Sequence, residues 1–154
     1  MGVSEPVVSD HPERLDALNL LCGELIGRGI SRHVFECRIR PDLVVKVEQG
    51  NRDRFQNILE WHAWSRVFGT PWEKWFAPVV EISHEGRLLL MKRTEPLRKK
   101  DLPAAMPAFF TDFKIQNYGM LDGRLVCHDY GTTLLMENGM SNRTRKVDHW
   151  RTDS

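Results

Sequence analysis

Polar side chains cluster around a tight turn in the stretch TDFKIQNYGMLDGRLVCHDYG, residues 111–131. Asp112 and Asn117 precede the turn, Lys114 lies between them, and Asp129 follows it. A carboxylate can accept the proton of an attacking hydroxyl, and an ammonium can neutralise a phosphoryl group. Amide and carboxylate oxygens are ligands that Mg²⁺ prefers. These residue types suit magnesium-assisted phosphoryl transfer, although a polar hairpin without function would show the same pattern.

Two earlier features could bind phosphates. Gly27 and Gly29 in IGRGISRHVF lie between two predicted strands, where glycine lets the backbone approach an anion, although a plain tight turn would also use it. Lys46 is an isolated cation in the apolar strand LVVKV. A buried ammonium needs a partner, and Glu60 in the next helix is the predicted one, with Glu48 as a rival. A lysine that reaches out from a sheet edge is the alternative.

The hydrophobic pattern predicts the elements that must position these residues. Residues 41–42 and 84–86 are predicted turns, and Asp122-Gly123 is a type I′ signal. After Thr133 the chain is polar and basic without an apolar period. The predicted elements are a short helix over 13–21, three antiparallel strands between about 23 and 48, a helix from about 52 to 68, a second hairpin over 75–93 and a small hairpin over 118–127.

Taken in order, four segments resemble motifs of the protein-kinase-like superfamily, over about residues 23–131. GRGISRHVF resembles the Gly-rich loop, with Arg32 in place of the third glycine, and VVKVE resembles the strand that carries the ATP lysine. TDFKIQN resembles the catalytic loop DxKxxN, and DYG resembles the magnesium-binding DFG. The resemblance implies an α+β fold: a kinase-like N-lobe antiparallel sheet with one packed helix, and a much reduced C-lobe carrying the catalytic-loop hairpin.

The resemblance also implies ATP and Mg²⁺ as cofactors and a role for each candidate residue. Carried over position by position, these roles are Gly27 and Gly29 over the nucleotide phosphates, Lys46 holding them and paired with Glu60, Lys92 and Arg93 opening a hinge beside the adenine, Asp112 as catalytic base, Lys114 on the phosphoryl group, and Asn117 and Asp129 as metal ligands.

The chain departs from the family pattern at several points. Phe110-Thr111 stands where His-Arg precedes the catalytic Asp, which predicts no activation by a phosphorylated loop. Residues 97–111 are too few for the long helices of a usual second lobe. We therefore expect one kinase-like domain over 1–154, with an N-lobe and hinge at about 13–96, a reduced catalytic portion at 97–133 and a polar basic tail at 134–154. Such compactness suits a phage or mobile-element protein.

The first functional hypothesis is a minimal ATP/Mg-dependent phosphotransferase, a small protein kinase of the Ser/Thr type. The alternatives are a catalytically weak or inactive nucleotide-binding module, and a small-molecule kinase that shares the site and differs in the acceptor. The acceptor, protein or small molecule, is not identified. Tryptophans at 61, 64, 72 and 75 suit a partner or homodimer surface, or they fill the space of the missing lobe.

Composition and charge limit the kinds of partner and the cellular location that we expect. The formal net charge is +1, which disfavours nucleic acid as a partner. No apolar run reaches the roughly 18 residues of a membrane span, and the N-terminus has no secretory pattern. Three widely spaced cysteines without a CxxC indicate reduced thiols rather than a disulfide framework. The expectation is a cytoplasmic protein that does not contact membranes.

Overall fold

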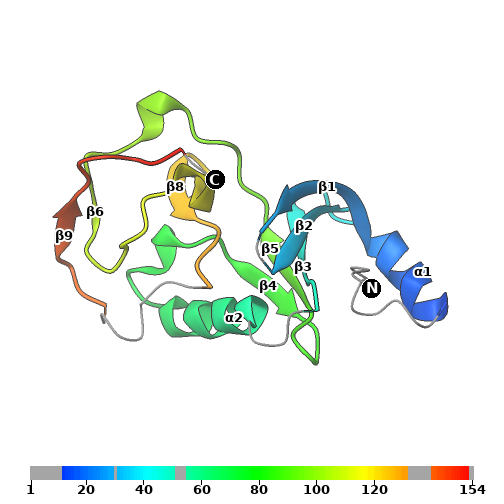
Figure 1. The fold of residues 1–154 in the computed structure, drawn as a ribbon. Helices are drawn as coiled ribbons and strands as arrows, with labels where there is room; N and C mark the ends of the chain where they lie inside the picture. Colours follow the sequence, from blue (N-terminus) through cyan, green and yellow to red (C-terminus); the bar gives the residue numbers. More distant parts are fainter. Residues whose placement is uncertain (1–11, 30, 51–54, 132–139, 153–154) are drawn as a thin grey trace. The chain divides into compact units, whose positions relative to one another are not determined.

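The computed structural model describes residues 12–29, 31–50, 55–131 and 140–152 (Figure 1). The predicted α+β class is confirmed: the described residues form helices and a five-stranded antiparallel sheet. The chain divides into two compact units. Unit 1 contains residues 1–61 and 78–93, and unit 2 contains residues 62–77 and 94–154. Each unit is described by itself.

Unit 1 is built around the sheet, whose strand order is β1-β2-β3-β5-β4 with every pair antiparallel. The apolar strand LVVKVE lies in the middle and is buried along its whole length, which explains its β-branched composition. The elements are α1 (Pro12–Leu21), β1 (Cys22–Arg28), β2 (Arg32–Cys37), β3 (Leu43–Glu48), β4 (Val79–Ile82) and β5 (Leu88–Lys92).

One hydrophobic cluster of unit 1 contains Cys37 from β2 and Leu43, Val45 and Val47 from β3. The helix α2 (Gln56–Val67) begins in unit 1 and ends in unit 2. Its start is fixed by Asn57, whose Nδ2 donates to the main-chain oxygens of Lys46, Gly86 and Arg87 at 3.1, 3.0 and 3.0 Å. One buried amide therefore ties the helix to β3 and to the β4–β5 turn.

Unit 2 consists of short elements around an aromatic core. Buried Phe76, Phe109, Phe110, Tyr118 and Tyr130 contact one another in a chain of rings with centroids 4.8–6.0 Å apart. The elements are η1 (Glu73–Trp75), η2 (Lys99–Asp101), β6 (Ala105–Pro107), η3 (Ile115–Asn117), β7 (Tyr118–Leu121), β8 (Arg124–Cys127) and β9 (Thr144–Lys146). Contacts between aromatic rings therefore supply much of the burial in this unit.

The small hairpin β7–β8 turns at Asp122 and Gly123, whose φ angles are 52° and 81°. A type I′ turn requires positive φ at both central residues, which the Asp-Gly pair provides. Gly119 in β7 is needed for a different reason, because a Cβ there would collide with the Thr94 side chain. The hairpin is thus held against the segment that enters unit 2.

The polar segment near the C-terminus contains a strand that the sequence did not predict. β9 pairs with β6 in antiparallel register, Met106 opposite Arg145, and Figure 1 shows the two side by side (β9 in red). Farther along, Trp150 contacts the rings of Phe113 and Tyr118 and donates from Nε1 to the Pro103 oxygen at 2.9 Å. We call residues 144–152 the strap.

Burial of the tryptophans does not separate the two interpretations of their role, because Trp64 is buried and Trp61, Trp72 and Trp75 are half-buried.

The three cysteines, Cys22, Cys37 and Cys127, all have free thiols in the structure. In the part of the chain that the structure describes, every helix is too short or too polar to cross a bilayer.

Candidate functional site

Lys46 and Glu60 form a buried ion pair in unit 1. Lys46 Nζ lies 2.9 Å from Glu60 Oε1, and the two side chains are 4% and 0% exposed. β3 carries the lysine at the sheet centre, and the first turns of α2 carry the carboxylate. The rival residue Glu48 bonds elsewhere: its Oε2 accepts the main-chain N–H of Asn57 at 2.7 Å.

Arg32 is a third member of this cluster that sequence reasoning treated only as a missing glycine. Its Nη1 and Nη2 donate to the two oxygens of Glu60, each at 2.9 Å, and Nη1 also donates to Asn57 Oδ1 at 2.9 Å. Arg32 opens β2 directly opposite Glu48 in the β2–β3 register. That register, which the sequence alone does not give, places Arg32 on the strand next to Lys46 and within reach of the same carboxylate.

The pKa values of Glu60 and Glu48 are shifted in opposite directions. Burial alone would raise the pKa of Glu60, but Arg32 and Lys46 hold that pKa below its ordinary value. Burial raises the pKa of Glu48, against the opposing pull of the Asn57 N–H and Arg32. The Oε1 atom of Glu48 is buried without a hydrogen-bond partner among the described residues. Unit 1 therefore holds one well-paired and one poorly compensated carboxylate.

Gly27, near the end of β1, and Gly29, in the turn that follows, have room for a side chain. An added Cβ at Gly27 would lie 3.7 Å from the Val34 Cβ, and one at Gly29 would lie 3.5 Å from the Arg32 oxygen. Both are ordinary contact distances, and neither glycine is among those with positive φ. Gly29 N donates to the Arg32 oxygen at 2.7 Å and closes the turn. Folding therefore does not explain the choice of glycine at these positions.

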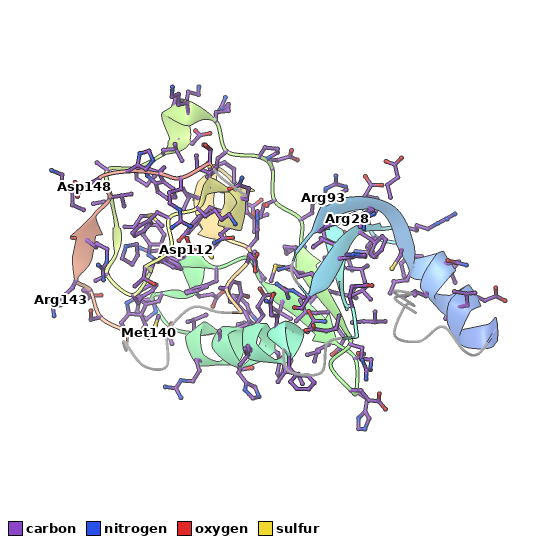
Figure 2. The ribbon with its side chains drawn as sticks, in the orientation of Figure 1. Arg28, Arg93, Asp112, Met140, Arg143 and Asp148 are labelled. Carbon is purple, nitrogen blue, oxygen red and sulfur yellow. The ribbon has the colours of Figure 1, made fainter. Side chains whose placement is uncertain are left out.

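Lys92 and Arg93, predicted to begin a hinge, use their polar groups within unit 1. Lys92 Nζ lies 3.0 Å from Asp42 Oδ2, and Arg93 Nη1 lies 3.2 Å from Glu36 Oε2 (Arg93 is labelled in Figure 2). Their main-chain N–H groups donate to the oxygens of Pro78 and Asp42, each at 2.9 Å. Neither N–H can donate to an adenine without giving up a bond that it already makes.

Unit 2 brings together the polar residues around the small hairpin. Asp112, Asn117 and Asp129 line one pocket, whose other walls are Phe110, Thr111, Tyr118 and Cys127. Asn117 Nδ2 donates to Asp112 Oδ2 at 3.2 Å. Asp112 lies in the loop between β6 and η3, Asn117 is the last residue of η3, and Asp129 lies just after β8. The pocket therefore exists because the β7–β8 hairpin folds Asp129 back beside the Asp112 loop.

The aromatic core fixes the backbone on both sides of this pocket. Tyr118 donates its hydroxyl to the Asp112 main-chain oxygen at 2.9 Å, and burial raises its pKa. Tyr130, the residue after Asp129, is buried and donates to the Ala77 oxygen at 2.9 Å. The two acidic residues are thus exposed side chains on a backbone that buried rings hold in place.

His128 ties three segments together beside Asp129. Its Nδ1 lies 2.7 Å from Thr94 Oγ1, and its Nε2 lies 2.7 Å from the Gln116 oxygen. Since a carbonyl only accepts, Nε2 must carry a proton. The main-chain N–H of His128 also donates to the Asn117 oxygen at 2.9 Å. Sequence reasoning did not select this histidine, which sets the spacing between the Asn117 and Asp129 backbones.

Arg151 reaches Asp112 from the strap. Its Nη2 lies 2.9 Å from Asp112 Oδ1, with both side chains about half exposed. The main chain of Arg151 forms an isolated parallel β-bridge with Lys114. Figure 2 labels Asp112 in unit 2 and Asp148 in the strap. A basic tail beyond the motifs gave no sequence signal for such a contact.

The donor set of the pocket fits a magnesium ion. Asn117 and Asp129 offer oxygen ligands, and Mg²⁺ is usually bound by one or two carboxylates together with substrate phosphates. Among the described residues, no three His, Cys, Asp or Glu side chains gather in a metal-binding cluster. The pocket suits a metal that arrives with a phosphate ligand better than a resident structural metal.

The predicted site residues thus fall into two clusters. Gly27, Gly29, Lys46, Glu60, Lys92 and Arg93 belong to unit 1, whereas Asp112, Lys114, Asn117 and Asp129 belong to unit 2.

The sequence matches no protein-family model and no curated protein sequence. Among solved structures, it is similar to the ternary complex of APH(2")-IIa with streptomycin and ATP, at 23% identity and a TM-score of 0.42. The similarity covers 60% of this chain and 31% of that chain, so this chain spans about a third of the neighbour's length. A likeness of this size supports no argument about fold or function.

Proposed function

We propose that this chain is a minimal ATP- and magnesium-dependent phosphotransferase that acts on a hydroxyl acceptor, as a small protein kinase of the Ser/Thr type does. The observation that supports it most is the pocket of unit 2, which Asp112, Asn117 and Asp129 line together. Phosphoryl transfer is mainly positioning and charge stabilisation, so a small scaffold can suffice.

In this proposal Asp112 accepts the proton of the acceptor hydroxyl, and Lys114 neutralises charge on the transferred phosphoryl group. Asn117 and Asp129 hold Mg²⁺, which when bound neutralises charge on the nucleotide phosphates. Lys46, held by Glu60, contacts the phosphates, and the turn with Gly27 and Gly29 covers them. The nucleotide would use carbonyl oxygens at Lys92 and Arg93, since their N–H groups already donate.

A second candidate is a nucleotide-binding module with little or no turnover. The observation that favours it is that arginines contact both key carboxylates: Arg151 binds Asp112, and Arg32 takes both oxygens of Glu60. A small-molecule kinase would share the site and differ only in its acceptor.

Transfer of labelled γ-phosphate to itself, to a general protein substrate and to a protein-free metabolite extract tests the proposal. We expect the wild type to transfer label, Asp112→Asn to lose most of the rate, and Asp129→Ala to lose the rise in Tm that MgATP gives the wild type. Asp148→Asn is the matched control, because Asp148 lies outside the pocket near Lys146. A rise in Tm with MgATP but no phosphate transfer supports the binding module. If the wild type shows no rise in Tm and no transfer, both candidates are refuted.

A further inference from the structure

Resting on the proposed function, we propose that Arg151 is a positioning residue that fixes the Asp112 carboxylate for proton transfer. Arg151 Nη2 contacts Asp112 Oδ1 at 2.9 Å, while Asn117 Nδ2 contacts Oδ2 at 3.2 Å. The terminal torsion of an aspartate is broad, so a carboxylate held at one oxygen still rotates. Held at both oxygens, it keeps one orientation. Asp112 is therefore held at both carboxylate oxygens, by Asn117 from the pocket lining and by Arg151 from the strap.

The main chain delivers Arg151 to this position. Arg151 N donates to the Phe113 oxygen at 2.9 Å, and Ile115 N donates to the Arg151 oxygen at 2.8 Å. These two bonds place Arg151 beside Lys114, which belongs to the same loop as Asp112. One residue before it, Trp150 packs on Phe113 and Tyr118. Tyr118 in turn binds the Asp112 main-chain oxygen. The arginine is thus anchored on the same groups that hold the aspartate backbone.

The contact leaves Asp112 able to act as a base. Each carboxylate oxygen has two lone-pair sites, and the structure gives each oxygen one described donor. The carboxylate is about half exposed, so an acceptor hydroxyl can approach it. The opposite interpretation is that Arg151 blocks Asp112 and must leave before the reaction. The two predict opposite changes in rate when the guanidinium is removed.

The test compares kcat and KM of the full chain with those of Arg151→Ala. We expect kcat to fall about tenfold to a hundredfold, because small misplacements of a catalytic group have effects of this size. KM for MgATP should stay within about twofold, since the lost contact acts on the base and not on nucleotide binding. Arg151→Lys should recover part of the rate, because lysine keeps the charge but lacks the planar fork. Guanidinium added to Arg151→Ala at non-denaturing concentration should also raise kcat.

Arg145→Ala is the matched control, because Arg145 is an arginine of the same strap whose Nη2 donates to the Ala108 main-chain oxygen. It should leave kcat within about twofold and should not respond to guanidinium. An Arg151→Ala variant as fast as the wild type, or faster, overturns the positioning role and leaves the phosphotransferase proposal standing. A wild type without transfer overturns the proposed function, and the catalytic role of Arg151 with it.

A second readout needs no activity. The ¹³C shift of the Asp112 side-chain carboxyl, identified by its loss in Asp112→Asn, reports contacts to that group directly. It should move in Arg151→Ala and stay in place in Arg145→Ala. If the shift is the same in the wild type and in Arg151→Ala, the ion pair is absent in solution and the inference fails whatever the activity.

Discussion

Arg32 and Glu60 form a two-pronged ion pair in the interior of unit 1, with both nitrogen–oxygen distances at 2.9 Å. The same carboxylate accepts Lys46 at 2.9 Å. One buried anion therefore contacts two buried cations. This arrangement makes Glu60 the residue on which the charge balance of the cluster depends.

Glu60→Gln should destabilise the protein by about 3–5 kcal/mol, because it removes the charge of a fully buried carboxylate that contacts two buried cations. Urea unfolding followed by circular dichroism measures the change. The control is Asp42→Asn, which also removes a carboxylate with two cationic partners, Arg40 and Lys92, but at an exposed site. Its effect should be much smaller. Equal effects of the two variants would contradict the structure of the cluster.

Glu48→Gln should make unfolding stability less sensitive to pH. The folded state raises the pKa of Glu48, so it binds that proton more tightly than the unfolded chain does. Stability then falls as pH rises from about 4.3, the ordinary glutamate pKa, through the raised value. Glu48→Gln cannot lose stability in this way. The difference in free energy of unfolding between the variant and the wild type should therefore grow across that pH window and stay constant above it. An advantage that is largest at low pH would contradict the sign.

Glu60 makes the opposite contribution in acid. Its pKa is lowered in the folded state, so its stabilisation is complete above the ordinary glutamate pKa and is lost as pH falls through the folded value. Acid unfolding of the wild type should therefore be steeper than that of Glu60→Gln, in titrations followed by circular dichroism.

Gly27→Ala and Gly29→Ala should fold as well as the wild type and bind MgATP more weakly. The structure has room for both Cβ atoms. For Gly27, which lies in β1, alanine is also favoured over glycine by about 0.5–1 kcal/mol. Tm without and with MgATP separates the two effects. Gly123→Ala is the contrasting variant: at φ 81° a side chain costs about 1–2 kcal/mol. If all three variants lose Tm equally without nucleotide, the glycine turn is structural.

Trp150→Ala should destabilise unit 2 by about 2 kcal/mol, below the usual cost for a fully buried tryptophan because this ring is half-buried. Trp150→Phe keeps ring contacts but loses the bond to the Pro103 oxygen, at about 1 kcal/mol. Thermal unfolding of the two variants measures these losses, and Tm should fall more in Trp150→Ala than in Trp150→Phe. Protease cleavage near residue 150 should increase in the alanine variant first. An unchanged Tm in Trp150→Ala would mean that the strap does not pack as described.

Local patterns in the sequence predicted much of the fold. The β-branched run LVVKV and the Asp-Gly pair at 122–123 are patterns of a few consecutive residues, so short-range rules suffice for them. β9 could not be predicted, because TRK has no apolar alternation and all three residues are exposed. It is a strand only because β6 lies opposite, and such pairing depends on tertiary context.

The candidate site shows the same limit. Lys46, Glu60, Asp112 and Asn117 stand out as polar residues in or beside recognisable motifs. Arg32 and Arg151 do not, because an arginine at a strand start or in a basic tail is ordinary until its partner is known. Both act across 28 or more positions of sequence. Single-residue patterns carry no information about partners at that distance.

The contact between Arg151 and Asp112 spans 39 positions, whereas the β7–β8 hairpin closes through a two-residue turn. Hairpins form in about 1–10 μs, and contacts distant in sequence slow folding because more chain entropy must be lost first. The β7–β8 hairpin should therefore form early in refolding, and the contact between Arg151 and Asp112 should form late. A refolding chain would pass through a stage in which this hairpin is present while the Asp112 carboxylate has not yet reached its final orientation.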